Sequence, residues 1–204
     1  MKFTLGIKQN MTQLFDEEGR VHPVTILQTG PMTITGLRTS EKDGYKAVQV
    51  GFGTRHEKNI NNAQKGQFGA LGNFRYVQEF RLAEKDNAQY TIGDKIDLAG
   101  FKEGDTIQVS AISKGKGFQG VVKRHGFHGG PRSHGQKHSE REPGSISGGL
   151  RTTLRSGMRM AGRMGSDRTT VKNLKVAQIN PEAGLIVVRG AIPGRRGTLV
   201  EIRG

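Results

Sequence analysis

The sequence contains no cysteine. This absence excludes disulfides, zinc sites built from thiolates and cysteine nucleophiles, and it is consistent with a reducing compartment. No run of apolar residues approaches the roughly 20 that a membrane helix needs. The N-terminal stretch reaches Lys8 without an uninterrupted apolar h-region, so it does not resemble a signal peptide. We therefore expect a soluble cytoplasmic protein with no membrane partner.

Acidic residues are scarce in one segment, residues 113–169. It holds 12 Lys or Arg against three acids, a net +9 of the chain's +14, whereas residues 1–112 carry +1 and residues 170–204 carry +4. It also holds 13 of the 31 glycines and few large apolar side chains, too few to offset its conformational entropy by burial. We expect it to become ordered against a polyanion, and nucleic acid is the first candidate.

Short segments rich in β-branched and alternating apolar residues dominate the rest of the chain. Glycine or proline interrupts it about every 8–12 residues, a spacing typical of a sandwich or small barrel. A turn is predicted at 180–184, and helical signal is confined to 56–72, where Gly66 and Gly69 are expected to break one or two short helices. Residues 75–82 fit a strand or a helical turn. The predicted strands are 23–27, 32–35, 46–52, 106–112, 171–179, 185–188 and 198–202.

The strands on either side of the basic segment are expected to belong to one barrel, so that 113–169 forms a long excursion from a folded body. Loops of this length inside compact domains are usually functional or disordered. Residues 41–94 are interpreted as a small α+β insertion. The predicted fold class is thus mainly β, with a long irregular basic extension.

Gly115, Gly117 and Gly120 form a GxGxxG pattern after a strand. Residues 121–131 do not predict an apolar-faced helix, so we expect no helix N-terminus for a pyrophosphate and no dinucleotide site. The favoured interpretation is that the glycines let the backbone approach a phosphate chain, while the neighbouring cations neutralise it. The alternative is a flexible glycine turn with solvated lysines.

Four histidines lie in the segment, with pairwise spacings that metal ligands also use: His125, His128, His134 and His138. The lack of thiolates and the positive surroundings disfavour a cation. We expect these imidazoles to hydrogen-bond to and stack on nucleotides instead. Nothing orients a nucleophile and a base, so we predict no enzyme, no catalytic residue, no metal and no cofactor.

Arginines recur at intervals of four or five through the end of the segment: Arg151, Arg155, Arg159, Arg163 and Arg168. Gly157, Gly162 and Gly165 disfavour a helix, so an irregular strand along an RNA groove is expected, with guanidinium groups on phosphates and bases. A solvated charged face is the alternative. RNA is favoured over DNA because no recognition helix is apparent.

Residues 101–124, FKEGDTIQVSAISKGKGFQGVVKR, resemble the signature of the universal large-subunit ribosomal protein three family, bacterial type. Further motifs occur in the family's order, although the glutamine that some bacterial members carry after Pro143–Ile146 is absent. The other resembling stretches are 5–8, 11–19, 130–135, 143–146, 160–165 and 190–194.

This resemblance implies a small closed β-barrel on the subunit surface, made of 1–40, 95–112 and 170–204, with 41–94 as the insertion. Residues 113–169 would be an extension that penetrates large-subunit rRNA toward the peptidyl-transferase centre. The family also implies a role in initiating subunit assembly, contacts with neighbouring large-subunit ribosomal proteins, and no small-molecule substrate.

The resulting site prediction has two parts. The predicted rRNA-binding side chains are Lys114, Lys116, Lys123, Arg124, His125, His128, Arg132, His134, Lys137, Arg141, Arg151, Arg155, Arg159, Arg163 and Arg168. Close backbone approach to RNA is predicted at Gly115, Gly117, Gly120, Gly129, Gly130, Gly144, Gly148 and Gly149. Two rivals stay open: a free-standing RNA chaperone or assembly factor, and a metal- or nucleotide-dependent enzyme that relies on His125 and His134.

Overall fold

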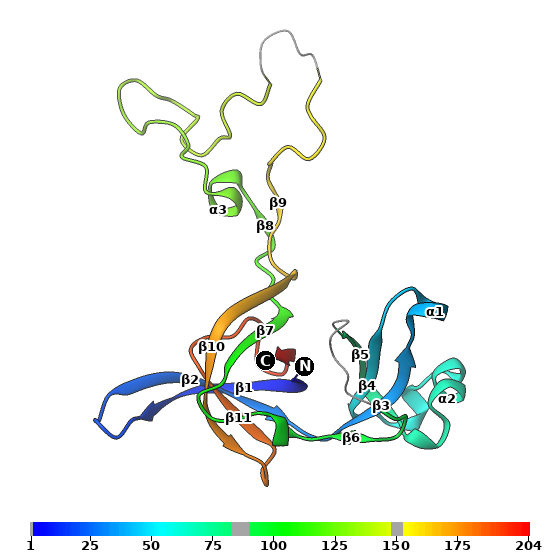
Figure 1. Ribbon diagram of the computed structural model, residues 1–204. Helices are drawn as coiled ribbons and strands as arrows, with labels where there is room; N and C mark the ends of the chain where they lie inside the picture. The colour runs from blue at the N-terminus through cyan, green and yellow to red at the C-terminus, as the bar shows by residue number, and fades with distance from the viewer. Residues whose placement is uncertain (1, 83–89, 148–152) are drawn as a thin grey trace. The chain divides into compact units, whose positions relative to one another are not determined.

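The computed structural model describes residues 2–82, 90–147 and 153–204 (Figure 1). The chain divides into two compact units. The first comprises residues 1–112 and 168–204, and the second, which we call the arm, is Ser113–Asp167.

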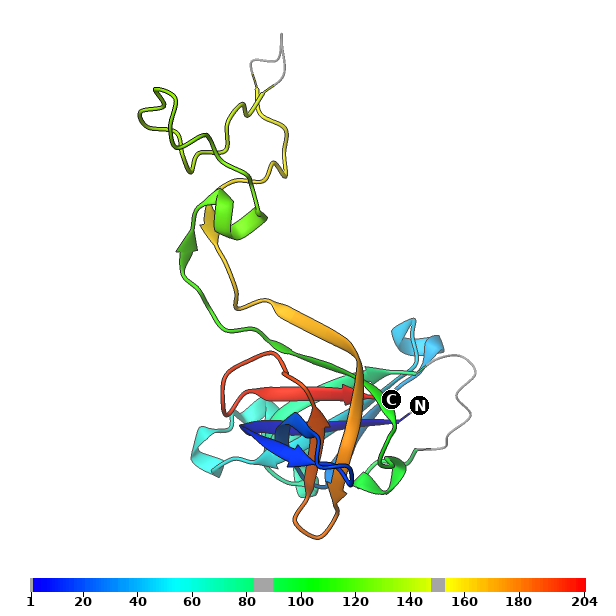
Figure 2. The same ribbon diagram turned by 90° about the vertical axis from the view of Figure 1, so that its left-hand side faces the viewer.

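A closed six-stranded barrel forms the larger part of the first unit, and all its strand pairs are antiparallel. The strands follow the order β1-β12-β7-β10-β11-β2. Neighbours β7 and β10 run side by side in both views (Figure 1, Figure 2). The predicted mainly β fold with a closed barrel is confirmed. The strands are β1 (Phe3–Phe15), β2 (Val21–Thr29), β7 (Thr106–Ile112), β10 (Arg168–Asn180), β11 (Leu185–Arg189) and β12 (Leu199–Arg203).

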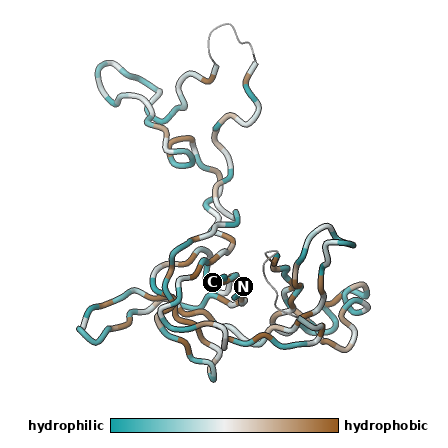
Figure 3. The backbone as a smooth tube through the Cα atoms, viewed as in Figure 1, coloured by the Kyte–Doolittle hydropathy of each residue, from teal (hydrophilic) through white to brown (hydrophobic). Residues whose placement is uncertain are grey.

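Alternation along the strands produces the barrel core, because successive side chains point to opposite faces. On β7, Ile107, Val109 and Ala111 are buried and belong to one cluster with Val200 and Ile202 of β12. Figure 3 shows hydrophobic residues concentrated along the strands of the first unit, whereas the arm is mostly hydrophilic or near neutral.

A second sheet of the first unit has the order β5-β4-β3-β6. Its strands β3 and β6 fall in ranges that the sequence assigned to the barrel body, but they pair with each other and β3 pairs with β4. The reason is burial: Met32 and Ile34 of β3 share an apolar cluster with Val48 and Val50 of β4. The elements are β3 (Met32–Arg38), α1 (Ser40–Asp43), β4 (Ala47–Thr54), η1 (Glu57–Asn59), α2 (Asn62–Phe68), η2 (Gly69–Leu71), β5 (Phe74–Arg81), β6 (Lys95–Ile96) and η3 (Leu98–Gly100).

Helix α2 corrects one expectation, because it continues through Gly66 and ends at Gly69. Two local features compensate for the glycine. The side chain of Asn61 caps the helix by accepting a hydrogen bond from the Gln64 amide at 2.8 Å. At the other end, Phe68 is buried and packs edge-on against Phe74, with ring centroids 5.7 Å apart.

Candidate nucleic-acid interface

Two segments of the arm form a narrow antiparallel ribbon. Strand β8 (Phe118–Gln119) pairs with β9 (Gly162–Arg163). The ladder continues through the Lys116 amide, which donates to the Met164 carbonyl at 2.9 Å. The ribbon carries the exposed side chains of Lys114, Lys116 and Arg163, and none of these makes an ion pair with any residue that the structure describes. Their charge is therefore available to a polyanion.

A short helix, α3 (Val121–His125), follows the GxGxxG pattern, so the expectation that no helix begins there was wrong. Val121 explains the difference. It is the one buried hydrophobic residue among the described residues of the arm, and it anchors the first turn. Gly126, with φ 71°, ends the helix in a left-handed conformation. The described residues still do not form a dinucleotide fold, because β8 pairs antiparallel with β9 and no parallel crossover follows among them.

The C-terminal turn of α3 is fixed to the returning chain. The Arg124 guanidinium donates to the Met160 carbonyl at 2.7 Å, and Nε2 of His125 lies 3.0 Å from the same oxygen. Gly162 makes room for this contact, since a Cβ there would lie 2.5 Å from Nη1 of Arg124. Arg124 and His125 are therefore partly buried and structural in this state, while Lys123 is exposed.

Beyond α3, the arm forms a hollow of about 310 Å³. Phe127 lies on one wall, and the Arg159 guanidinium lies over its ring at 5.1 Å from the centroid. The His125 ring is 6.0 Å from the same phenyl ring. A flat base fits a surface of this kind, which offers an aromatic face beside two arginines. Sequence reasoning missed Phe127, although an isolated aromatic residue among glycines and cations was an available signal. The lining residues are Phe127, Arg155, Ser156, Gly157, Met158 and Arg159.

A loop closes between residues 129 and 140. The Gly130 amide donates to the Glu140 carbonyl at 3.0 Å. Gly129 has φ 76°, and an added Cβ would collide with that same carbonyl. The close approach seen at these glycines is thus between two parts of the arm's own backbone. Arg132 lies 3.7 Å from a carboxylate oxygen of Glu140 but is 92% exposed, so a phosphate can compete for it.

The remaining predicted residues fall into three groups. Arg151, Gly148 and Gly149 lie outside the described residues. Arg168 lies in β10 of the first unit, where its guanidinium makes two hydrogen bonds to Glu201, at 2.8 and 2.5 Å. The other predicted cations and imidazoles are exposed: Lys114, Lys116, Lys123, His128, Arg132, His134, Lys137, Arg141, Arg155, Arg159 and Arg163.

Eight exposed Lys or Arg side chains of the arm make no ion pair within the part of the chain that the structure describes. Together with the single buried hydrophobic residue, they distinguish the arm from an ordinary domain, whose charges are balanced and whose interior is apolar. The eight are Lys114, Lys116, Lys123, Lys137, Arg141, Arg155, Arg159 and Arg163.

The family model for ribosomal protein L3 matches residues 76–186, more than half of the chain. The chain belongs to the ribosomal protein L3 family. Several relatives are named large ribosomal subunit protein uL3. The one from Acidothermus cellulolyticus is 46% identical over all of this chain and 92% of its own length, and the one from Finegoldia magna is 43% identical over all of this chain and 97% of its own length. The relative from Streptomyces coelicolor is 45% identical, covering all of this chain and 95% of its own length.

Other kinds of site are not apparent in this member of the L3 family. The described residues contain no group of three or more His, Cys, Asp or Glu placed to hold a metal ion. In the same ranges, no helix has the length and apolar character needed to cross a membrane.

Proposed function

We propose that this chain is a structural component of the large ribosomal subunit in the cytoplasm, and that its arm binds large-subunit rRNA directly. The main support is the arm, whose described residues include eight exposed cations without an ion pair and one buried hydrophobic residue. Such a segment gains little by packing on itself and much by neutralising phosphates. The names of the relatives support the assignment to the large subunit.

The finer parts of the proposal come from the family resemblance and the length of the arm. Binding early in subunit assembly, contacts with neighbouring ribosomal proteins and support of the region around the peptidyl-transferase centre are all included. The barrel serves as the anchor in this scheme, because its core is closed and complete without the arm's residues. The proposal assigns no catalytic step to any side chain.

Limited proteolysis tests the proposal on the full chain. Trypsin cuts after exposed Lys and Arg, so we expect rapid cleavage between residues 114 and 163 in the free protein and protection when large-subunit rRNA is bound. Cleavage at equal rates in both states would refute the idea that RNA covers the arm.

A second candidate function is that of a free-standing assembly factor using the same arm. Sedimentation after a high-salt wash separates the two. A structural component remains with mature large subunits, whereas an assembly factor is released from them.

A further inference from the structure

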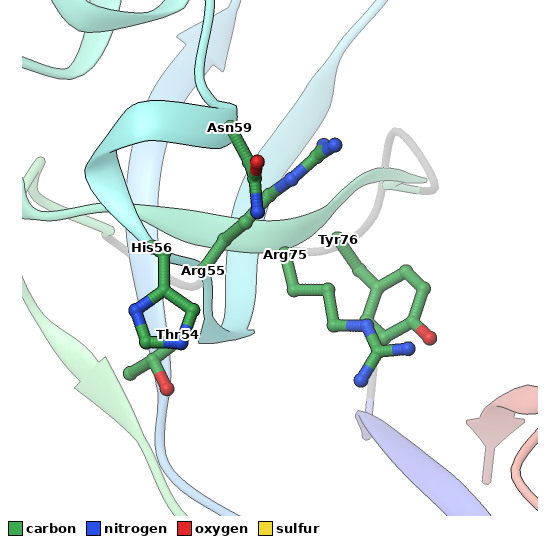
Figure 4. Close-up of a pocket in the computed structure, with 6 residues that line it drawn as sticks. All are labelled: Thr54, Arg55, His56, Asn59, Arg75 and Tyr76. Atoms are coloured by element: carbon green, nitrogen blue, oxygen red, sulfur yellow. The ribbon is translucent and has the colours of Figure 1, made fainter.

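The second sheet of the first unit carries a cleft outside the arm. It lies where β4 ends and β5 begins, and its volume is about 610 Å³. This volume falls within the range of about 300–1,000 Å³ that small-ligand sites occupy. Figure 4 shows Thr54 and His56 on one side, Arg75 and Tyr76 on the other, and Arg55 and Asn59 between them.

The walls of the cleft are held by backbone hydrogen bonds and packing. The Arg55 amide donates to the Asn73 carbonyl at 3.0 Å, and the Asn59 amide donates to the His56 carbonyl at 2.9 Å. Ile60, directly after η1, is buried. Because these contacts involve backbone and core atoms, the charged and polar side chains that line the cleft remain available to a ligand. Tyr76 is half-buried and also packs on Phe52, with ring centroids 6.5 Å apart.

Charge and aromatic surface coincide here. Neither Arg55 nor Arg75 makes an ion pair or side-chain hydrogen bond with any described residue, and both are exposed. The nearest acid in sequence, Glu57, is already paired with Lys65 at 2.9 Å. The Arg75 guanidinium lies over the Tyr76 ring, 5.2 Å from the centroid. Since Arg75 is exposed, the second face of that guanidinium is accessible to a flat ligand.

We propose that this cleft is a second RNA-binding site, which takes one unpaired nucleotide. The base stacks on the Arg75–Tyr76 pair, the amide of Asn59 and the hydroxyl of Thr54 meet its polar edge, and Arg55 neutralises the adjoining phosphate. This inference rests on the proposed RNA-binding function but not on the arm. A purely electrostatic site for acidic protein would not require the aromatic ring.

Photo-crosslinking of the full chain to a single-stranded RNA containing 4-thiouridine tests the site, with peptide mapping as the readout. We expect crosslinks within 54–76 in addition to those in the arm. Stacking contributes about 1–3 kcal/mol per base, so Tyr76→Leu should weaken the crosslink at the cleft by about 5- to 150-fold. Arg55→Ala, at an exposed position, should weaken the crosslink as well, and it serves as a check against a folding defect in the Tyr76 variant.

The matched control removes Lys42 and Lys46, two exposed cations of the same lobe at the opposite end of β4. Eight strand residues, or about 25 Å, separate them from the cleft, so this variant should crosslink like the wild type. An equal loss of the crosslink at the cleft in the control variant would overturn the site. It would also be overturned if polyglutamate of equal charge displaced the RNA and the Tyr76 substitution had no effect on the crosslink.

The position of the crosslinks distinguishes this inference from the proposed function. Crosslinks in the arm alone would overturn the cleft and leave the arm's role intact. Crosslinks in the cleft alone would support the cleft as an RNA-binding site and refute RNA binding by the arm. Crosslinks in neither region would refute both.

Discussion

Removing the three cations of the arm's ribbon should change how rRNA binding responds to salt. We consider the variant Lys114→Ala/Lys116→Ala/Arg163→Ala. Each neutralised phosphate contributes about 0.7–0.9 to the slope of log K against log salt. If the eight unpaired cations of the arm each meet one phosphate, the wild-type slope is about −6 to −7. Loss of three contacts should make it shallower by about 2–3.

The change in slope also sets the loss of affinity at a given salt concentration. Counterion release scales as the salt concentration raised to that slope, so at 0.1 M salt the variant should bind about 100- to 500-fold more weakly, and the gap should close near 1 M. Filter binding of large-subunit rRNA from 0.05 to about 0.5 M salt measures both quantities. The control variant replaces Lys42, Lys46 and Lys175, three exposed lysines of the first unit.

The stability of the variant should be measured in parallel with its RNA binding. The ribbon's backbone hydrogen bonds do not depend on the three side chains, so we expect the fold to be unaffected. We expect the free energy of unfolding of the barrel, measured by thermal denaturation, to change by less than about 0.5 kcal/mol, as for ordinary surface substitutions. A slope change below about 1, or the same change in the control, would show that the ribbon does not contact phosphate and would refute the reasoning.

Three further predictions concern single positions. Gly129→Ala should open the loop at residues 129–140, because φ is 76° and a Cβ meets a carbonyl there; faster proteolysis of the loop with an unchanged barrel melting temperature is expected. Arg168→Ala should lower the free energy of unfolding by about 1 kcal/mol in urea titrations. Buried Glu201 loses both hydrogen bonds from Arg168 and keeps Arg203, 3.9 Å away, while Arg168 itself is half-exposed and screened by solvent. Weaker RNA binding without destabilisation would return Arg168 to the interface. The Tyr45 hydroxyl holds the pKa of Glu79 below its usual 4.5, so ionised Glu79 contributes to the free energy of unfolding above pH 4.5, and this contribution is lost as the pH falls through the lower pKa of the folded state. Glu79→Gln should therefore make the free energy of unfolding depend less on pH in that window. An unchanged pH dependence below pH 4.5 would contradict this.

The strands predicted from alternating and β-branched residues are present. Strand β11 shows the expected period of two in its burial, whereas β4 is buried along residues 47–52 without alternation. Strand β7 occupies the predicted residues, Thr106–Ile112. The N-terminal strand β1, Phe3–Phe15, was not predicted, because polar residues interrupt the alternation in its second half. That half pairs with β2 but has no buried residues. No local pattern reveals that kind of stabilisation.

The charge of the arm could be predicted from composition alone, but its internal contacts could not. Which cation meets a carbonyl and which meets solvent depends on pairings such as Arg124 with Met160, 36 residues apart. The cleft was missed for a related reason: Arg55 and Tyr76 are 21 residues apart in sequence, and only the pairing of β4 with β5 brings them together. The sequence around each shows no distinguishing motif.

The register of β7 and β10 has a consequence for how this protein is built. Ile112 and Arg168, the residues at which the chain leaves and re-enters the barrel, are direct cross-strand partners. The arm is therefore an insertion at the tip of a β-hairpin. The pairing of the two hairpin strands holds the ends of this long insertion together and so offsets the entropic cost of closing the loop. A different insertion, longer, shorter or of another sequence, could be grafted between these two positions without altering a single pairing below them.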